Sequence, residues 1–238
     1  MSNYEPIHAS RHGQLRLKPT DGFSFAAPHH LVSVVLHEFP NVSVNYPIVF
    51  VKAPETGKYR PVALLGLEPG KNPFVDAKGQ WQAGTYIPAA FRRYPFALAE
   101  DGSDNLTVCI DTESPFVGTQ EGERLFDEQG LITPVLGKIR DFLKELSISE
   151  RMAQLFCDRL VELDLLVPGG LQIQEQGQVR QYDGSYVIDE NRLAKLTAEQ
   201  FLSLREQGFI AAVYSHLTSL LQLQKLVLMR GDAASPAA

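Results

Sequence analysis

Cysteine is scarce in this chain of 238 residues. Only Cys109 and Cys157 occur, far apart in sequence and each within an apolar stretch. Two thiols cannot supply the cross-links of a disulfide scaffold, and they cannot form a structural zinc site without histidine ligands. Because free cysteine is among the most frequently buried residues, we interpret both as small core side chains.

Positive charge is also in short supply. Lysine and arginine number 22 against 28 aspartate and glutamate residues, which gives a net charge of -6 and an isoelectric point near 5.5. Nucleic-acid-binding proteins usually carry a broad basic surface, and anionic lipid repels an acidic chain. The composition therefore predicts no nucleic-acid partner and no attraction to an anionic membrane.

A long uninterrupted hydrophobic run is missing as well. The most apolar late segment, residues 209–229, contains polar residues such as Ser215, His216 and Lys225, whereas a membrane-spanning helix needs about 20 mainly apolar residues. The first residues lack the basic segment and apolar run of a classical signal peptide. We therefore predict no membrane insertion and a cytoplasmic location.

What the chain does contain is enough apolar material for a sizeable core. Hydrophobic residues make up 44% of it and charged residues 21%, a composition that excludes global disorder. In the first half, β-rich segments at residues 46–51 and 61–66 flank a turn-forming segment at 53–58. Short strands at such intervals are typical of an antiparallel meander.

The second half follows helical periodicity. Thr133 and Pro134 suit the N-cap and first position of a helix. Capping-box spacings at residues 147–150 and 197–200 predict two further helix starts, and Gly208 is expected to end the second of these helices.

A β-hairpin is predicted among these helices. Residues 179–188 read as two short strands joined at Asp183 and Gly184, a pair suited to a type I′ turn. The predicted fold class is α+β. We expect a β-rich N-terminal lobe with an antiparallel meander over residues 1–120 and an α-rich C-terminal lobe with the hairpin over residues 121–238, the two forming one compact unit.

Familiar catalytic motifs are absent from the sequence. It contains neither the G-x-G-x-x-G of dinucleotide-binding folds nor the G-x-S-x-G nucleophile elbow. Residues 66–72 resemble a phosphate-binding loop, but the glycines are one residue too close, and Asn72 stands where a magnesium-binding Ser or Thr would be. We interpret this segment as a turn between strands.

Histidines and carboxylates provide no recognisable metal or acid–base motif. His29, His30, His37 and Glu38 lack the H-E-x-x-H or H-x-D spacing, so we interpret the histidines as surface or interfacial residues and expect no metal and no cofactor. His216 lies on an apolar helix face and is expected to be a hydrogen-bonded core residue. Acidic residues cluster in two places, and we favour solvated side chains for both: Asp101, Asp104, Asp111 and Glu113, then Glu121, Glu123, Asp127 and Glu128.

The segment 81–96 is the richest candidate for ligand binding. It holds the sole tryptophan together with tyrosines and two adjacent arginines: Trp81, Tyr86, Arg92, Arg93 and Tyr94. Arginine binds carboxylate or phosphate through two parallel hydrogen bonds, and aromatic rings supply rigid contact surface. These five residues are therefore the predicted binding site for a small anionic or aromatic ligand. The competing interpretation is a structural turn whose arginines pair with the acidic loops. We favour this structural interpretation.

A family resemblance extends from about His12 to Leu226. The chain resembles bacterial SapC-family proteins in a set of short motifs: His12-x-x-Leu15-Arg16, Phe23, Phe25-Ala26, Glu38-Phe39, residues 46–50, 63–67, 74–76, 86–89 and 92–96, Gly122-x-x-Leu125-Phe126, residues 187–189 with Leu193, and Tyr214-x-His216-Leu217-x-Ser219-Leu220.

What the resemblance implies about function is modest. The family name comes from a gene associated with a bacterial surface layer. The resemblance also implies an association of family members with outer-membrane receptor systems. No catalytic residues are carried over by the resemblance. The leading hypothesis is an accessory or binding protein without enzymatic activity, which supports nutrient uptake or a surface-layer system through a protein partner or a small ligand.

Two alternatives stay open. One is an enzyme with an unrecognised site built from Arg92, Arg93, Tyr94 and an acid such as Asp111 or Glu113. The other is a surface-layer component that reaches the cell surface by a non-classical export route. The oligomeric state has no sequence signature.

Overall fold

The computed structural model describes residues 3–100, 106–169, 171–175, 178–182 and 184–233. Its contacts divide the chain into two compact units, each built from two separate segments. Unit 1 consists of Met1–Phe23 and Ala89–Ile148, and unit 2 consists of Ser24–Pro88 and Ser149–Ala238. The units therefore alternate along the chain, whereas the predicted lobes over 1–120 and 121–238 are consecutive; those lobes stay a prediction.

Unit 1 contains two small antiparallel sheets. The first has the order β1-β7-β6, and the second the order β8-β2-β9. Three helices accompany them among the described residues of unit 1, and the last is shared with unit 2. The elements are β1 (Tyr4–Pro6), α1 (Ala9–His12), β2 (Arg16–Leu17), α3 (Ala89–Arg92), β6 (Phe96–Glu100), β7 (Leu106–Asp111), β8 (Val117–Gly118), β9 (Glu123–Arg124) and α4 (Pro134–Glu162).

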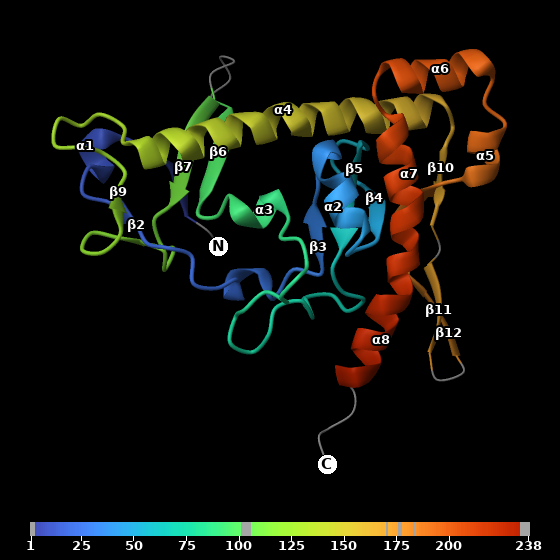
Figure 1. Ribbon diagram of the computed structural model, residues 1–238, viewed down its shortest axis with the longest axis horizontal. Coiled ribbons are helices and arrows are strands. Elements are labelled where there is room, and N and C mark those ends of the chain that lie inside the picture. The colour runs from blue at the N-terminus through green and yellow to red at the C-terminus, as the bar shows by residue number, and fades with distance from the viewer. Residues whose placement is uncertain (1–2, 101–105, 170, 176–177, 183, 234–238) are drawn as a thin grey trace. The chain divides into compact units, whose positions relative to one another are not determined.

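The core of unit 1 lies between the first sheet and the first turns of α4. Phe96 and Ile110 come from the sheet, Leu125 from the loop after β9, and Leu136 and Leu143 from the helix; all five are almost fully buried. In Figure 1 the N-terminal part of α4 runs beside β6 and β7. The helix thus covers one face of the sheet.

Helix α4 corrects one prediction and confirms another. It starts at Pro134, immediately after Thr133, as predicted, but it continues without a break through residues 147–150 to Glu162. The expected helix start at 147–150 is therefore wrong. The reason is that buried apolar residues continue at helical spacing, with Leu143 and Leu146 before this segment and Ala153 after it. Ser147 and Ser149 are therefore interior positions of the helix.

Unit 2 is built on one five-stranded antiparallel sheet of order β10-β13-β4-β5-β3. Its elements in the first segment are η1 (Ser24–Ala26), β3 (Leu31–Ser33), η2 (Leu36–Glu38), α2 (Phe39–Ser43), β4 (Ile48–Lys52) and β5 (Tyr59–Leu64). Those in the second are β10 (Leu166–Pro168), β11 (Leu171–Glu175), β12 (Gln178–Tyr182), β13 (Ser185–Ile188), α5 (Glu190–Ala194), α6 (Ala198–Glu206), α7 (Ile210–Ser219), η3 (Leu220–Gln222) and α8 (Leu223–Ala233).

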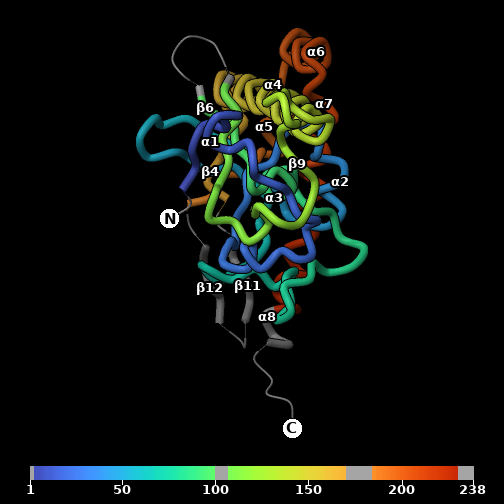
Figure 2. The backbone as a smooth tube through the Cα atoms, turned by 90° about the vertical axis from the view of Figure 1, so that its left-hand side faces the viewer, coloured from blue at the N-terminus to red at the C-terminus, as the bar shows by residue number. Residues whose placement is uncertain are grey.

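Helices pack on one face of this sheet. Phe50 in β4 contacts Phe156 in α4 and His216 in α7, with ring centroids 6.1 and 5.1 Å apart. Helix α6 lies beside the end of α4 in both views (Figures 1 and 2), where Arg159 donates a hydrogen bond to Ser203 Oγ at 2.6 Å. The capping box at Thr197 opens α6 as predicted, and Gly208, with φ of +75°, follows its end.

The predicted hairpin lies at a different place in the chain. Residues 178–182 pair with 171–175, so the hairpin is β11–β12. Residues 185–188 pair instead with β10 and β4 and form part of the main sheet. The predicted turn residue Asp183 lies outside the described residues. Because a period-two pattern specifies strands but not their partners, the position of the hairpin was wrong although its presence was right.

The α+β class is confirmed. Antiparallel strands predominate in the first half of the chain and helices in the second. In the first half, β4 pairs with β5 and β6 with β7 as consecutive strands, while β3 pairs with the far side of β5. Both cysteines are buried, as predicted.

Candidate functional site

The predicted ligand-binding segment 81–96 is divided between the two units. Trp81 and Tyr86 belong to unit 2, whereas Arg92, Arg93 and Tyr94 belong to unit 1.

In unit 2, Trp81 is part of an internal hydrogen-bond network. Its side chain is 9% exposed, and its Nε1 donates to Tyr46 Oη at 3.2 Å and to Thr85 Oγ1 at 3.0 Å. Tyr46 is fully buried and donates in turn to the backbone oxygen of Tyr86 at 2.7 Å. Burial raises the pKa of the Tyr46 phenol, so this group keeps its proton. The indole nitrogen thus holds the loop that contains Tyr86.

Tyr86 extends the same network to a buried carboxylate. Its hydroxyl donates to Glu38 Oε1 at 2.9 Å, and the backbone nitrogen of Val35 donates to Glu38 Oε2 at 3.2 Å. Glu38 is only 1% exposed, so its oxygen atoms need donors of this kind in place of water. Glu38 follows His37 directly in the sequence, but its pairing with Tyr86, which is 48 residues away, has no sequence signature.

In unit 1, the structure brings Tyr94 together with Asp111. The Tyr94 hydroxyl donates to Asp111 Oδ2 at 3.2 Å, and Asp111 is 4% exposed. The favoured solvated state is therefore wrong for Asp111, because the β1–β7 and β6–β7 pairings surround the end of β7. Asp101 and Asp104 lie outside the described residues, and Glu113, Glu121, Glu123 and Glu128 are exposed as expected.

Tyr4 joins this group from the N-terminal strand. It lies opposite Asp111 in the β1–β7 pairing, and the positive charge of Arg93 acts on its phenol. Burial, the largest influence on each, raises the pKa of Tyr4 and of Tyr94. Both phenols therefore hold their protons at neutral pH, which suits hydrogen bonding better than acid–base catalysis. No sequence pattern marks Tyr4, because only the long-range strand pairing brings it here.

Arg92 occupies a different position. Its side chain is exposed, and its guanidinium carbon lies 5.4 Å from the centroid of the Phe142 ring in α4. A cation–π contact of this kind holds a guanidinium in place against the face of an aromatic ring. The arrangement is compatible with anion binding at the surface of unit 1.

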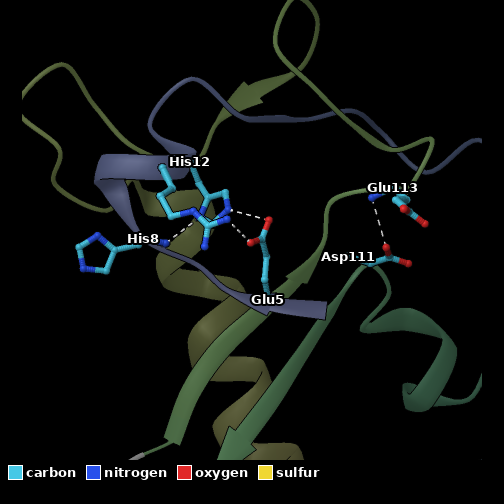
Figure 3. Close-up of polar contacts among 6 residues, drawn as sticks. Glu5, His8, His12, Asp111 and Glu113 are labelled. Carbon is cyan, nitrogen blue, oxygen red and sulfur yellow. Dashed lines mark hydrogen bonds and ion pairs between the residues drawn. The ribbon is translucent and has the colours of Figure 1, made fainter. Parts of the chain in front are cut away.

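A second polar group in unit 1 surrounds Glu5 (Figure 3). The Glu5 carboxylate accepts from Arg11 at 2.7 Å and faces His12 Nε2 at 3.2 Å, while the His8 amide donates to His12 Nδ1 at 2.9 Å. Nδ1 is thus an acceptor and Nε2 carries the proton. The hydrogen bond from His12, followed by the charge of Arg11, lowers the pKa of Glu5. The contact of His12 Nε2 with Glu5 links α1 to β1, whereas the bond from the His8 amide to Nδ1 lies within the turn of α1 itself. In the same view, Asp111 Oδ1 accepts from the Glu113 amide at 3.2 Å.

The remaining histidines occupy separate places. His37 Nδ1 lies 3.0 Å from Ser149 Oγ, and His30 Nδ1 accepts from the Gly70 amide at 3.3 Å. His216 is fully buried, as predicted for a core histidine. Across the part of the chain that the structure describes, no three histidine, cysteine or carboxylate side chains gather as metal ligands would.

A cavity of about 370 Å³ opens on the face of the unit 2 sheet that is opposite the helices. We call it the sheet-face cavity. Because strand residues alternate between faces, Val49 and Val51 point away from the side of Ile48 and Phe50, and the strand pairings place Leu31, Leu64 and Ser185 on that same face. The described lining residues are His30, Leu31, Val49, Val51, Leu64, Gly66, Leu67, Pro69, Gly184 and Ser185.

The rim of the sheet-face cavity is a fixed turn. Residues 68–71 form a type II β-turn, in which Pro69 precedes Gly70 with φ of +80° and the Lys71 amide bonds to the Glu68 carbonyl at 3.1 Å. Buried Asn72 ties the turn down by donating to the Ala26 carbonyl at 3.2 Å. A Cβ at Gly66 would collide with the Lys71 carbonyl oxygen, so the chain closes tightly here. The interpretation of residues 66–72 as a turn is confirmed.

No motif in the sequence predicts the sheet-face cavity. Its lining combines strand residues such as Val49 and Leu64 with loop residues such as Pro69, and the pairing of β13 with β4 joins residues far apart in the chain. The one available signal was the continuous run Ile48–Val51, which is typical of a strand covered on both faces. In this sheet the helices cover one face, and the cavity occupies part of the other face.

The fold and the cavity together define an α+β protein with a preformed apolar hollow on a five-stranded sheet. The sequence model of the SapC family matches residues 7–226, and the chain belongs to that family. The search of curated proteins and the search of solved structures gave no significant match. Among the described residues, every helix is too short or too polar to traverse a bilayer.

Proposed function

We propose that this SapC-family protein is an accessory binding protein that takes up a small, largely aromatic ligand in the sheet-face cavity and catalyses no reaction on it. The observation that carries the proposal is the cavity itself, whose described lining residues all belong to unit 2. Small-molecule pockets commonly have volumes of about 300–1,000 Å³ and mainly hydrophobic walls.

The size of the cavity indicates the size of the ligand. Its volume of about 370 Å³ is more than twice that of an engineered apolar cavity of about 150 Å³ that binds benzene. One or two fused rings fit this space. Val49, Leu64 and Leu67 are 1%, 8% and 7% exposed, so a ligand would contact side chains that are already in place.

The fixed rim favours binding further. The turn at residues 68–71 is held by its own hydrogen bond and by Asn72, so little ordering is needed when a ligand enters. A preorganised site loses less conformational entropy on binding and therefore binds more tightly.

The distribution of titratable groups supports binding over catalysis. Among the described lining residues only His30 carries a group that titrates near neutral pH. The buried acid Asp111 lies in unit 1 and is hydrogen-bonded to a phenol that keeps its proton. An accessory role in nutrient uptake or in a surface-layer system, and a cytoplasmic location, belong to the same proposal.

A second candidate is the binding of a small anion by Arg92, Arg93 and Tyr94. The exposed Arg92 guanidinium over Phe142 favours it. Trp81 and Tyr86 lie in the other unit, with their polar side-chain atoms engaged in the Tyr46–Glu38 network. An Arg92→Ala, Arg93→Ala double variant tests this candidate, since loss of an anion's stabilising effect in that variant and not in Arg140→Ala would support it.

The leading proposal is tested by filling the cavity. The protein is screened with one- and two-ring aromatic compounds by thermal unfolding, and the hits are measured by isothermal titration calorimetry. Val51→Phe places a ring in the cavity and is expected to weaken each hit at least 10-fold, because the added side chain occupies the ligand's space.

Val44→Phe is the matched control. It makes the same change at a residue that is 66% exposed and lies outside the cavity, and it should leave the affinities unchanged. Hits that bind Val51→Phe as tightly as the unchanged protein would place the ligand elsewhere and overturn the proposal.

A further inference from the structure

The polarity of the sheet-face cavity is set by very few groups. Of the described lining residues, only His30 and Ser185 have polar atoms in their side chains, and none is lysine, arginine or a carboxylate. A ligand that fits the apolar walls therefore has two side-chain partners for its polar atoms. What each of them offers follows from the bonds it already makes.

Ser185 offers only lone pairs. Its hydroxyl donates to the Gly169 carbonyl at 2.9 Å, which uses its single hydrogen. The hydroxyl can still accept a hydrogen bond from a ligand. It cannot be the donor for an oxygen atom that enters the cavity.

His30 offers a donor. The Gly70 amide donates to His30 Nδ1 at 3.3 Å, so Nδ1 carries the lone pair, and in the neutral ring the proton is on Nε2. Burial, and then the neighbouring His29, lower the pKa of His30, which keeps the ring neutral at pH 7. Within the part of the chain that the structure describes, Nε2 makes no hydrogen bond. It is the one N–H or O–H donor that the lining side chains have left.

We propose that the sheet-face cavity selects neutral aromatic molecules that carry an acceptor oxygen, such as aryl ketones, and that His30 Nε2–H is the group that recognises this oxygen. The inference rests on the proposed function, because it specifies the ligand of the same cavity. An apolar wall without a cation disfavours carboxylates, since a buried anion without a partner loses its hydration. A hydrocarbon of the same shape forgoes the hydrogen bond and leaves Nε2–H unpaired.

Three ligands of nearly equal shape test the inference. They are 2-acetylnaphthalene, 2-isopropylnaphthalene and 2-naphthoate, and their affinities for the full chain are measured by equilibrium dialysis at pH 7.5. The ketone is expected to bind about 3- to 10-fold more tightly than the hydrocarbon, the range that a net hydrogen bond provides. The carboxylate is expected to bind most weakly.

Two substitutions assign the preference to His30. His30→Leu removes the donor and should make the ketone and the hydrocarbon bind equally. His30→Gln keeps an N–H donor near the position of Nε2 and should retain the preference. Thermal unfolding of both variants checks that they are folded, and hydrocarbon binding by His30→Leu shows that the cavity is intact.

The outcomes separate this inference from the proposed function. If none of the three ligands binds the unchanged protein, the proposed function fails. If the ketone and the hydrocarbon bind equally, or the carboxylate binds best, the role of His30 is wrong while the cavity remains a binding site. A ketone preference that survives in His30→Leu would also overturn the inference.

Discussion

His216 Nδ1 donates a hydrogen bond of 2.9 Å to the carbonyl oxygen of Ile48, a residue 168 positions earlier in the chain. Its Nε2 accepts from the Ile188 amide at 3.0 Å, so both ring nitrogens are used and the neutral tautomer is defined. One side chain of α7 thereby joins strands β4 and β13. Because the ring is buried, it can make both bonds only while it is neutral.

The stability of the protein is expected to fall in mild acid because of this residue. Burial, opposed by the bond to Ile48, lowers the pKa of His216 to about 4, whereas the unfolded chain has an ordinary value of about 6.5. The unfolded state therefore binds more protons between these values, and the stabilising contribution present above pH 6.5 is lost as the pH falls towards 4. Lowering the pH from 7 to 5 should cost about 2 kcal/mol from this group.

Urea unfolding at the two pH values measures this loss. His216→Gln keeps one donor and one acceptor but has no titration, and the pH dependence of its unfolding free energy should be smaller by about 2 kcal/mol. Equal pH dependence in the two proteins would show that His216 is not buried in its neutral form.

The two cysteines are expected to be unreactive in the folded protein. Burial raises the pKa of Cys157 to about 12 and also raises that of Cys109. At pH 8 only about one Cys157 in 10,000 would be thiolate, the form that attacks disulfide reagents. A chromogenic disulfide should therefore label neither residue within minutes under native conditions and both in 6 M guanidinium. Rapid native labelling would contradict the burial of these thiols.

Removing the Tyr86 hydroxyl should destabilise unit 2. Tyr86→Phe takes one donor from the buried Glu38 carboxylate, and the expected loss of unfolding free energy is about 1–3 kcal/mol, as for other hydrogen bonds to buried charged groups. Tyr214→Phe makes the same change at a side chain that is 50% exposed and should cost less than about 0.5 kcal/mol. Equal effects in chemical denaturation would argue against the Tyr86–Glu38 bond.

The capping box of α6 provides a further test. Thr197 Oγ1 accepts from the Gln200 amide at 3.2 Å, and Gln200 Oε1 accepts from the Thr197 amide at 2.9 Å. Thr197→Ala should lower the unfolding free energy by about 1 kcal/mol. Thr218→Ala, at an exposed position of α7, should not lower it, because alanine has the higher helix propensity. Circular dichroism during thermal unfolding would report both effects.

Local signals in the sequence predicted the features that depend on a few neighbouring residues. The helix start at Pro134, the capping box at Thr197 and the buried states of Cys157 and His216 all follow from short patterns. The capping-box spacing at residues 147–150 predicted a helix start where none occurs, since continued packing of α4 outweighs a local preference.

Features that depend on distant pairing could not be predicted in the same way. The partner of Glu38 is Tyr86, and the partner of Tyr94 is Asp111; neither pair has a fixed spacing that marks it in advance. Residues of the predicted binding segment 81–96 do form side-chain hydrogen bonds, but the boundary between the two units, at residues 88 and 89, divides the segment. The sheet-face cavity depends on the placement of β13 next to β4, which residues 179–188 alone do not reveal.

The alternation of the two units along the chain has a consequence for folding during translation. Unit 1 can acquire its last core residues once Leu143 and Leu146 have left the ribosome, although residues 24–88 of the other unit are already outside by then. Strand β4 must wait longer, because the amide of Ile48 bonds to Ser219 Oγ, 171 residues later. The sheet of unit 2 therefore stays incomplete through most of the synthesis of the chain. Residues 24–88 are the second segment to be made, but they are the last to complete their packing.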